Sequence, residues 1–456
     1  MRAENHLRDL VGQRVSFSLT LRAGEAAPAR SAVLAAVGVL SAVPEDAAAG
    51  TFDDYLAGAG VSFRLARGRV LAVEREASAY HRFCVRAAGR FDAILGLGLE
   101  TRPELAGLLR AMMLGRTQEL SEEQEGLFMR SGTMHLFAIS GMNIAVIAGA
   151  LAVLLRWLRL GGWAGFAVSA GALWLFVDIT GASPSAVRVW VMAVFLQAAW
   201  RLRRPANPLA AVTASALAVL LAGPAQFFSA IFQMSYGIVA ALLLMGLPLG
   251  EAWLARWTPW RDLPEVTWGR WRRAVAEAWR WTAQAVAIGG ATTLVSMVAG
   301  VRFFQLLTPG ALLANLALIP AAALATLAGF ISLLCGLVGL TPAAALANNV
   351  AGLTLWLIEG VVRVGTQVPG AFLAARFRAD WIGPAALAAL LATMLAGYAW
   401  GWRRERGGFW PPVAVVAVAL GFGVSFGPWA APEKTAGAEN RAWSVGLRPY
   451  LRPINP

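Results

Sequence analysis

The sequence has 456 residues, of which 58% are hydrophobic and 14% are charged. An average soluble domain has about 25% charged residues, whereas several apolar runs here reach the ~20 residues that a membrane-spanning helix needs. The composition therefore excludes an ordinary water-soluble enzyme and predicts a polytopic α-helical membrane protein.

The net charge of +13 comes almost entirely from arginine, because Lys434 is the only lysine. The arginines gather in short loops, as the cytoplasmic loops of membrane proteins require, so the charge alone does not indicate nucleic-acid binding. The two cysteines, Cys84 and Cys335, do not support a disulfide framework. We expect no bound metal and no cofactor, because the histidines are too scattered for the spacing of metal ligands: His6, His81 and His135.

Residues 1–76 are expected to form a small β-rich domain. Residues 11–22 alternate between apolar and polar, with Val15, Phe17 and Leu19 on one face, which is typical of a half-buried strand. A second strand is expected over 32–43 and a third over 61–65. The Arg67-Gly68 pair then predicts a turn into a return strand over 69–74.

Helical periodicity replaces the alternation from about residue 78. Pro103 suits the first turn of a helix over 103–114. Ser121 followed by Gln124 is a capping-box pattern, which predicts a helix from there to about Arg130. We expect residues 77–133 to form amphipathic helices at the membrane surface that lead into the first span.

Residues 134–430 are expected to form the membrane domain, and residues 431–456 a flexible tail. The apolar runs predict about ten transmembrane helices, over 134–155, 163–180, 185–200, 208–223, 227–249, 283–301, 310–338, 343–365, 383–402 and 411–428.

The arginines predict which side of the membrane each loop faces. If the first span begins outside, the outward loops hold only Arg302, Arg376 and Arg378, with Arg363 close by. The inward loops hold Arg156, Arg159, Arg201, Arg203, Arg204, Arg256, Arg261, Arg270, Arg272, Arg273, Arg280, Arg403, Arg404 and Arg406. This asymmetry predicts that both termini lie on the non-cytoplasmic side of the membrane. Export of residues 1–76 then needs an upstream segment or an unusual route.

The largest inward loop, residues 251–282, is rich in tryptophan and arginine. Trp268, Trp271 and Trp279 share one helical face, and Arg272 and Arg273 lie elsewhere around the helix. The pattern predicts a basic amphipathic helix lying on the anionic inner leaflet, with nucleic-acid contact as the alternative.

Polar residues inside the predicted spans need partners, because hydrocarbon offers none. They fall at four places: the start of the first span, the turn between the second and third spans, the middle of the fifth, and the seventh beside its proline. The candidates for lining a pathway are His135, Ser140, Gly141, Asn143, Asp178, Ser183, Ser185, Arg188, Gln233, Ser235, Asn315 and Pro320.

Each of these places has a purely structural alternative. His135 can anchor the span at the interface, while Ser140 and Gly141 permit close helix packing. Asp178 and Arg188 can meet across the turn as a structural ion pair. The polar residues of the fifth span can form interhelical hydrogen bonds, and a proline bends a helix. Glu359 and Arg363 can pair locally at i,i+4.

Four sequence blocks resemble the ComEC competence family. Gly115, residues 127–132 and the run 135–141 resemble the first; residues 180–188, 232–236 and 313–320 resemble the second, third and fourth. The blocks follow the family order and cover roughly residues 105–330. The strand-rich start, with residues 52–56, is similar to the family's OB-like domain.

The resemblance implies a channel that carries single-stranded DNA into the bacterial cytoplasm during natural transformation and is not itself an enzyme. It implies as partners single-stranded DNA, membrane lipids and other competence proteins, including a separate cytoplasmic ATP-driven motor, since the chain has no Walker motif; a homo-oligomer stays open. In the family the OB-like domain meets the incoming strand outside, and basic and aromatic groups serve that purpose. The candidates here are Phe17, Phe63, Arg64, Arg67 and Arg69.

The sequence departs from the family pattern at three places. It shows no counterpart of the spans that usually precede the OB-like domain, and none of the metallo-β-lactamase-like domain with its His-x-His-x-Asp-His motif, so no nuclease role is carried over. Asn143 stands where the family usually has histidine, which argues against a titrating or metal-binding role there.

Two other classes of function stay open. One is a diverged transporter of a small or lipid-linked substrate. The other is an intramembrane hydrolase using Ser140 and His135, whose five-residue spacing makes contact on one helix awkward and which lacks an obvious second base.

Overall fold

The computed structural model describes residues 12–19, 28–44, 53, 56–57, 60–137, 141–202, 207–260, 262–403, 405 and 407–427. The chain divides into two compact units. The first comprises Met1–Arg90, Gly223–Ser229 and Ala430–Pro456, and the second Phe91–Ala222 and Ala230–Trp429. The predicted tail, 431–456, lies outside the described residues.

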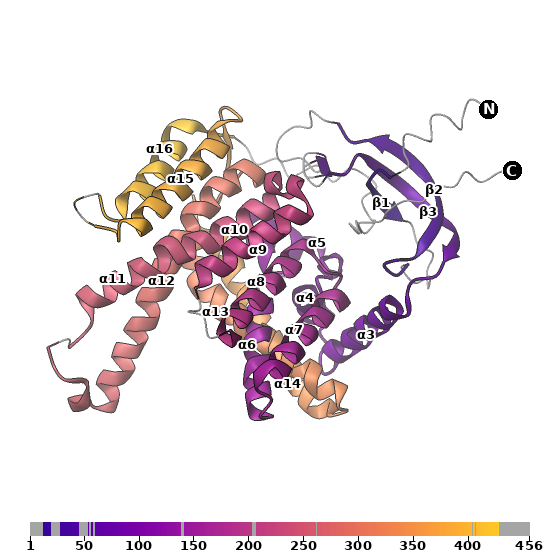
Figure 1. Ribbon diagram of the computed structural model, residues 1–456, viewed down its shortest axis with the longest axis horizontal. Helices are drawn as coiled ribbons and strands as arrows, with labels where there is room; N and C mark the ends of the chain where they lie inside the picture. Colours follow the sequence, from indigo (N-terminus) through magenta and orange to yellow (C-terminus); the bar gives the residue numbers. More distant parts are fainter. Residues whose placement is uncertain are drawn as a thin grey trace. The chain divides into compact units, whose positions relative to one another are not determined.

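The first unit contains a three-stranded sheet, as expected for a β-rich N-terminus (Figure 1). Its strands are β1 (Val15–Leu19), β2 (Val33–Ala42) and β3 (Phe63–Arg75), in the order β1–β3–β2. β1 runs parallel to β3, and β2 runs antiparallel to it.

The return strand predicted over 69–74 is wrong, because β3 is one continuous strand of 13 residues. Arg67 does adopt a left-handed backbone, with φ of 52°. In the ladder with β2, Ala66 pairs with Val39 and Arg69 with Val37, so two residues oppose one. The Arg67-Gly68 signal therefore makes a β-bulge instead of a hairpin turn.

The second unit is mostly helical. Its helices and short segments after α3 (Ala79–Gly96) are α4 (Pro103–Leu114), η1 (Thr117–Glu119), α5 (Glu122–Arg130), η2 (Met134–Leu136), α6 (Gly141–Trp157), α7 (Gly162–Ile179), α8 (Pro184–Arg201), α9 (Pro208–Ala222), α10 (Ala230–Ala241), η4 (Leu242–Gly246), α11 (Leu247–Trp257), η5 (Glu265–Thr267), α12 (Arg270–Phe304), α13 (Ala311–Leu337), α14 (Thr341–Gly365), α15 (Ile382–Ala399) and α16 (Trp410–Gly423). η3 (Pro224–Phe228) belongs to the first unit.

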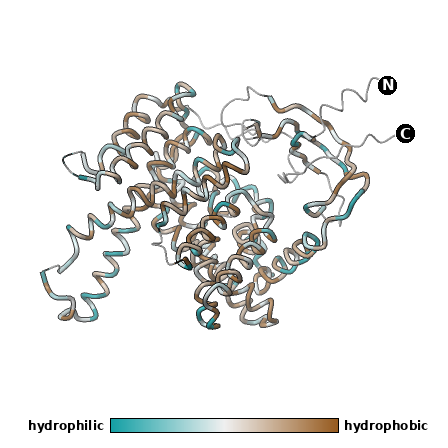
Figure 2. Tube along the Cα trace, in the orientation of Figure 1, coloured by the Kyte–Doolittle hydropathy of each residue, from teal (hydrophilic) through white to brown (hydrophobic). Residues whose placement is uncertain are grey.

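A helix lies at each of the ten predicted spans. Among the described residues, seven helical segments are long and apolar enough to cross a membrane, α9 and α16 are shorter apolar helices, and α8 belongs to neither group. Figure 2 shows mostly hydrophobic residues along these helices, with hydrophilic residues in turns and also along α11 and the first part of α12. The chain is therefore a multi-pass membrane protein with a small sheet at its N-terminus.

The predicted amphipathic helix over 268–282 is not a separate element. It is the first part of α12, a single helix of 35 residues. No proline or glycine lies between Arg270 and Ile288, so nothing interrupts the helix before it joins the sixth span. On the other side of the loop, α11 continues the fifth span.

Small residues let α11 and the π-helical η4 pack closely against α12. A Cβ at Gly246 would meet the Ile288 Cα at 3.0 Å, and one at Gly250 would overlap Gln284. The π-helical turn η4 is a single turn of five residues within this segment. Leu244 O accepts a hydrogen bond from Trp402 Nε1 over 3.0 Å, which ties the turn to the α15–α16 connection.

A second three-stranded sheet lies at one end of the helices. Its strands are β4 (Leu306–Leu307), β5 (Leu373–Phe377) and β6 (Val424–Phe426), in that order and antiparallel. They follow α12, α14 and α16. This sheet end therefore joins segments that are far apart in the sequence.

Helix α4 is packed inside the helical unit. Leu109 and Met113 lie against Gly329 of α13, and Leu105 lies against Gly352 of α14. Asn348 Nδ2 donates to Leu97 O over 2.9 Å and so fixes the α3–α4 turn. The surface location expected for residues 77–133 stays a prediction, but α4 itself is a core element.

Candidate functional site

Arg188 is the most unusual side chain of the helical unit, since it is a charged group only 2% exposed. The start of α8 fixes its position. Ser183 caps the helix by accepting from Ala186 N over 3.3 Å, and Pro184 occupies the first turn. One turn further on, Arg188 Nη2 donates to Ile231 O over 3.2 Å. The guanidinium therefore lies between α8 and α10.

Asp178, the acidic residue across the same turn, is also buried, with 6% exposed. Gly181 and Ala182 reverse the chain with φ of 96° and 47°, which brings the end of α7 beside the start of α8. Burial of an isolated charge costs several kcal/mol, so two opposite charges buried near one turn favour each other. Their direct pairing stays a prediction.

Helix α10 collects polar side chains next to Arg188. Ser215 Oγ of α9 donates to the Tyr236 hydroxyl over 3.2 Å. Arg302 Nη1 of α12 donates to Gln233 Oε1 over 2.9 Å. Ser235 is half-buried on the same helix. The second and third sequence blocks thus meet here: α8 and α10 are in contact, and α10 bonds α9 and α12.

The candidate residues at the start of the first span lie in different environments. His135 is exposed, and its Nδ1 lies 2.9 Å from Gly132 O. Ser140 lies outside the described residues. A Cβ at Gly141 would meet Val189 Cγ2 at 2.9 Å, so this glycine allows α6 and α8 to approach closely. That agrees with the packing role considered for it.

Asn143 is buried and bonds two other helices. Its Nδ2 donates to Met112 O over 3.1 Å, and its Oδ1 accepts from Thr326 Oγ1 over 3.1 Å. It therefore links α6 to α4 and α13. Among the described residues no group of three or more His, Cys, Asp or Glu side chains is placed to hold a metal.

Helix α13 runs without a break from Ala311 to Leu337 and contains Pro320. Pro320 is exposed on the helix surface. One helical turn earlier, Asn315 Oδ1 is buried and has no hydrogen-bond partner among the described residues. Asn315 is therefore an unsatisfied acceptor within a span.

The register of the N-terminal sheet sorts the predicted DNA-binding residues between two faces. Phe17 pairs with Leu65, and Val15 with Phe63, which places both phenylalanines on one face. Arg64 pairs with Ser16 and lies on the opposite face. Arg67 and Arg69 are exposed at and beside the bulge. The aromatic and basic candidates thus do not form one continuous surface.

The sequence did not reveal an open cleft of about 600 Å3 at the sheet end, lined by Glu122, Glu123, Arg130, Leu306 and Phe372 among others. The predicted Glu359–Arg363 pair is present, with Arg363 Nη2 donating to Oε1 over 2.9 Å. It extends further, because Arg363 also bonds Glu123 over 2.7 Å and Gln124 donates to Glu359 over 3.1 Å. The pair thus anchors α5, which forms one wall of the cleft.

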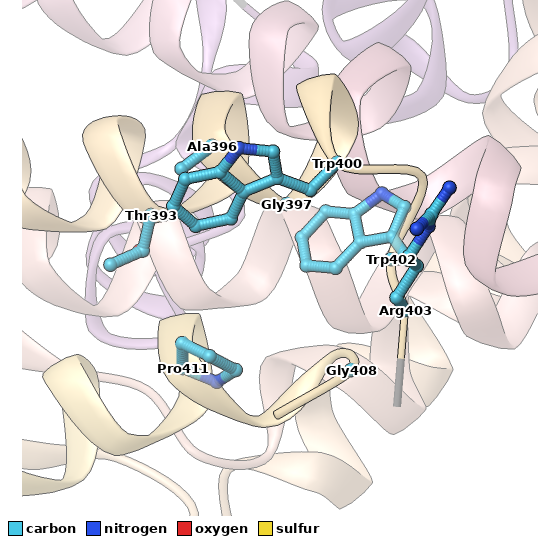
Figure 3. A pocket seen from close by; sticks show the side chains of 8 residues that line it. All are labelled: Thr393, Ala396, Gly397, Trp400, Trp402, Arg403, Gly408 and Pro411. Atoms are coloured by element: carbon cyan, nitrogen blue, oxygen red, sulfur yellow. The ribbon is translucent and has the colours of Figure 1, made fainter. Parts of the chain in front are cut away.

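A smaller cavity of about 70 Å3 lies at the α15–α16 turn. Figure 3 shows Trp400, Trp402 and Arg403 at its rim, with Gly408 and Pro411 opposite. Trp402 stacks on Phe409 with 4.5 Å between ring centroids. Its size suits a few water molecules, and it carries no functional argument.

These features define a multi-pass membrane protein with charged and polar side chains buried between its helices. Residues 112–404 match the family described as Competence protein, and because this match covers more than half of the chain, the protein belongs to that family.

A stretch of 146 residues is 28% identical to ComE operon protein 3 of Bacillus subtilis (strain 168). It covers 31% of this chain and 18% of the relative, so the chain spans only a small part of that protein's length. No solved structure matches the chain.

Proposed function

We propose that the protein is an inner-membrane channel component for the uptake of single-stranded DNA in natural transformation. Membership of the Competence family supports this. The observation that carries it is Arg188, a buried guanidinium at the meeting point of two family blocks. An ionisable residue inside a membrane domain is costly to bury and is by default a candidate for a functional site. The protein is not itself the enzyme or the motor of this process.

The proposed orientation follows the positive-inside rule. The turns opposite the sheet end carry Arg156, Arg159, Arg201, Arg256 and Arg403, and these turns would face the cytoplasm. The sheet end and both termini would lie on the non-cytoplasmic side. The 600 Å3 cleft beside α5 would then open toward the incoming strand.

The N-terminal sheet is proposed to be part of an OB-like domain that meets the strand. Phe17 and Phe63 would stack on bases, and Arg67 and Arg69 would contact phosphates at the bulge of the central strand β3. A separate cytoplasmic ATPase, other competence proteins and membrane lipids would be the remaining partners. Assembly as a homo-oligomer is compatible with this proposal.

Replacement of Arg188 by alanine tests the proposal. In a naturally transformable host lacking its own copy, the Arg188→Ala variant should lower transformant recovery at least tenfold, while binding of labelled DNA to the cell surface is unchanged. Arg201→Ala is the matched control, because Arg201 is exposed at the other end of the same helix. Both variants must reach the membrane in equal amounts.

Normal transformation by the Arg188→Ala strain would contradict a pathway role for Arg188. Normal transformation by a strain that lacks the gene altogether would contradict the channel proposal and favour a transporter of another substrate. Purified lipid and small-molecule pools from the deletion strain would then identify that substrate.

A further inference from the structure

The inner hairpin, residues 247–281, extends away from the helical bundle beyond its base, where Leu249 packs against the bundle core. Figure 1 shows α11 and the first part of α12 side by side, with their connecting turn away from the other helices of this unit. Nine residues of α12 are buried, but Ala276 is the only one before Ala283. The first third of α12 therefore packs mainly on α11.

The length of α12 carries the hairpin beyond the bilayer. Its 35 residues correspond to about 52 Å at 1.5 Å per residue, against a hydrocarbon core of about 30 Å. Trp281 is 54% exposed and lies about 35 Å along the helix from Phe304. With Phe304 at one face of the hydrocarbon core, Trp281 lies at the interface on the other face, where tryptophan is enriched. Residues 270–280 then extend a further ~16 Å, past the lipid headgroups.

The turn of the hairpin is held by its own side chains. Trp268 is buried, and its Nε1 donates to Leu263 O over 3.2 Å. The Trp260 ring meets Trp268 edge-on with 6.3 Å between centroids, and Arg272 Cζ lies 5.9 Å from the Trp260 centroid. These contacts fix the start of α12 and occupy Arg272.

The neighbouring residues have no such internal role. Arg270 and Arg273 are exposed, and their side chains have no ion-pair or hydrogen-bond partner among the described residues. Trp271 is 75% exposed. No acidic residue lies in the first turn, so the two arginines oppose the helix dipole and repel each other. This arrangement of charges lowers the stability of the fold, so the two arginines serve a purpose other than stability.

We propose that Arg270, Trp271 and Arg273 bind the strand of single-stranded nucleic acid that emerges from the bundle. The two guanidiniums would each contact a phosphate, and the indole would stack on a base without sequence preference. The inference rests on the proposed function, because DNA uptake through the bundle would supply the strand. A lipid headgroup is a poorer occupant, because the site lies beyond the bilayer surface and exposes an aromatic ring that headgroups do not stack on.

Photo-crosslinking tests the site. The full chain is placed in phosphatidylcholine nanodiscs with a 12-nucleotide oligothymidylate carrying 5-iodouracil, and the crosslinked peptides are mapped by mass spectrometry. Binding is followed in parallel by fluorescence anisotropy at several salt concentrations. The variants are Arg270→Ala/Arg273→Ala and Trp271→Ala. The matched control, Arg156→Ala/Arg159→Ala, removes two exposed arginines from the α6–α7 turn on the same side.

Crosslinks are expected on the peptide that holds Trp271. Loss of Arg270 and Arg273 should flatten the slope of log affinity against log salt for this site by about 1.4, since each single-strand phosphate contributes about 0.7. Trp271→Ala should weaken binding about 5- to 150-fold and leave the slope unchanged. The control should keep wild-type affinity and slope.

The outcomes separate this inference from the proposed function. Crosslinks confined to the N-terminal sheet or the helical bundle, with Arg270→Ala/Arg273→Ala equal to the control, would overturn the hairpin site and leave the channel standing. No crosslink anywhere would contradict both. The contribution of Trp271 to the fluorescence is the signal that is lost in the Trp271→Phe variant. If brominated lipids quench this signal, the tip of the hairpin lies in the bilayer, and the inference is also overturned.

Discussion

Thr326 donates its hydroxyl to Asn143 Oδ1 over 3.1 Å, and this bond joins α13 to the first span inside the helical unit. The same asparagine donates to Met112 O over 3.1 Å. Both side chains are buried, with Asn143 2% and Thr326 0% exposed. One amide therefore holds three helices in a fixed relation immediately after the end of the first family block.

A double-mutant cycle measures this bond. Asn143→Ala should lower the free energy of unfolding in detergent by about 1–3 kcal/mol, because it leaves Met112 O buried without this donor. Thr326→Val should lower it less, because the single hydroxyl proton of Thr326 is shared between Asn143 Oδ1 and Ala322 O of its own helix. The coupling between the two should be near the ~0.6 kcal/mol typical of membrane proteins. Strictly additive effects would show that the Asn143–Thr326 bond contributes nothing.

Gly397 and Gly421 should respond oppositely to an added methyl group. A Cβ at Gly397 would overlap the Trp402 indole, whereas a Cβ at Gly421 would meet nothing within 4 Å. Gly397→Ala should therefore cost about 1–3 kcal/mol in unfolding free energy, and Gly421→Ala should be neutral or stabilising. Thermal unfolding in detergent checks both, and equal melting temperatures would contradict the contact.

The capping box of α5 should control the order of the cleft wall. Ser121 accepts from Gln124 N over 3.2 Å, and Gln124 Oε1 accepts from Ser121 N over 3.2 Å. Ser121→Ala should lower the local stability of α5 by about 1 kcal/mol, measured as faster amide exchange in residues 122–130. Gly126→Ala in the same helix should slow exchange, because nothing lies within 4 Å of its added Cβ. Unchanged exchange in the serine variant would contradict the cap.

Cysteine labelling checks the proposed orientation. In a Cys84→Ser/Cys335→Ala background, a cysteine replacing Arg376 should react with an impermeant maleimide added to spheroplasts, because Arg376 is exposed at the sheet end. A cysteine replacing Trp271 should react only after the membrane is permeabilised. The reverse pattern would place the inner hairpin outside and contradict the proposed topology.

Much of the fold follows from local pattern. A helix lies at each of the ten predicted spans, although among the described residues only seven helical segments are long and apolar enough to cross a membrane. The Ser121 cap forms as the sequence indicates. Apolar runs and helix caps depend on residues close together in the chain, so a single sequence is enough to predict them. The Arg67-Gly68 signal shows the limit. The left-handed backbone is there, but whether it makes a turn or a bulge depends on β2, a partner strand more than 20 residues away.

The candidate site, like the fold, was predictable from the sequence only in its local features. Asp178 and Arg188 were singled out as charges near a tight turn, and both are buried. That Arg188 bonds Ile231, or that Gln233 bonds Arg302, depends on contacts between helices 43 and 69 residues apart. Helical periodicity carries no information on which helices are neighbours, so the partners and the cleft beside α5 needed the tertiary structure.

Helix α12 also has a mechanical consequence. It is unbroken between Arg272, which touches Trp260, and Arg302, which touches Gln233. Thirty residues of helix make a rod of about 45 Å, and a tilt of about 5° around its centre moves each end by about 2 Å in opposite directions. A force on the inner hairpin would therefore also displace the opposite end of α12 at Arg302, because the helix is continuous between the two.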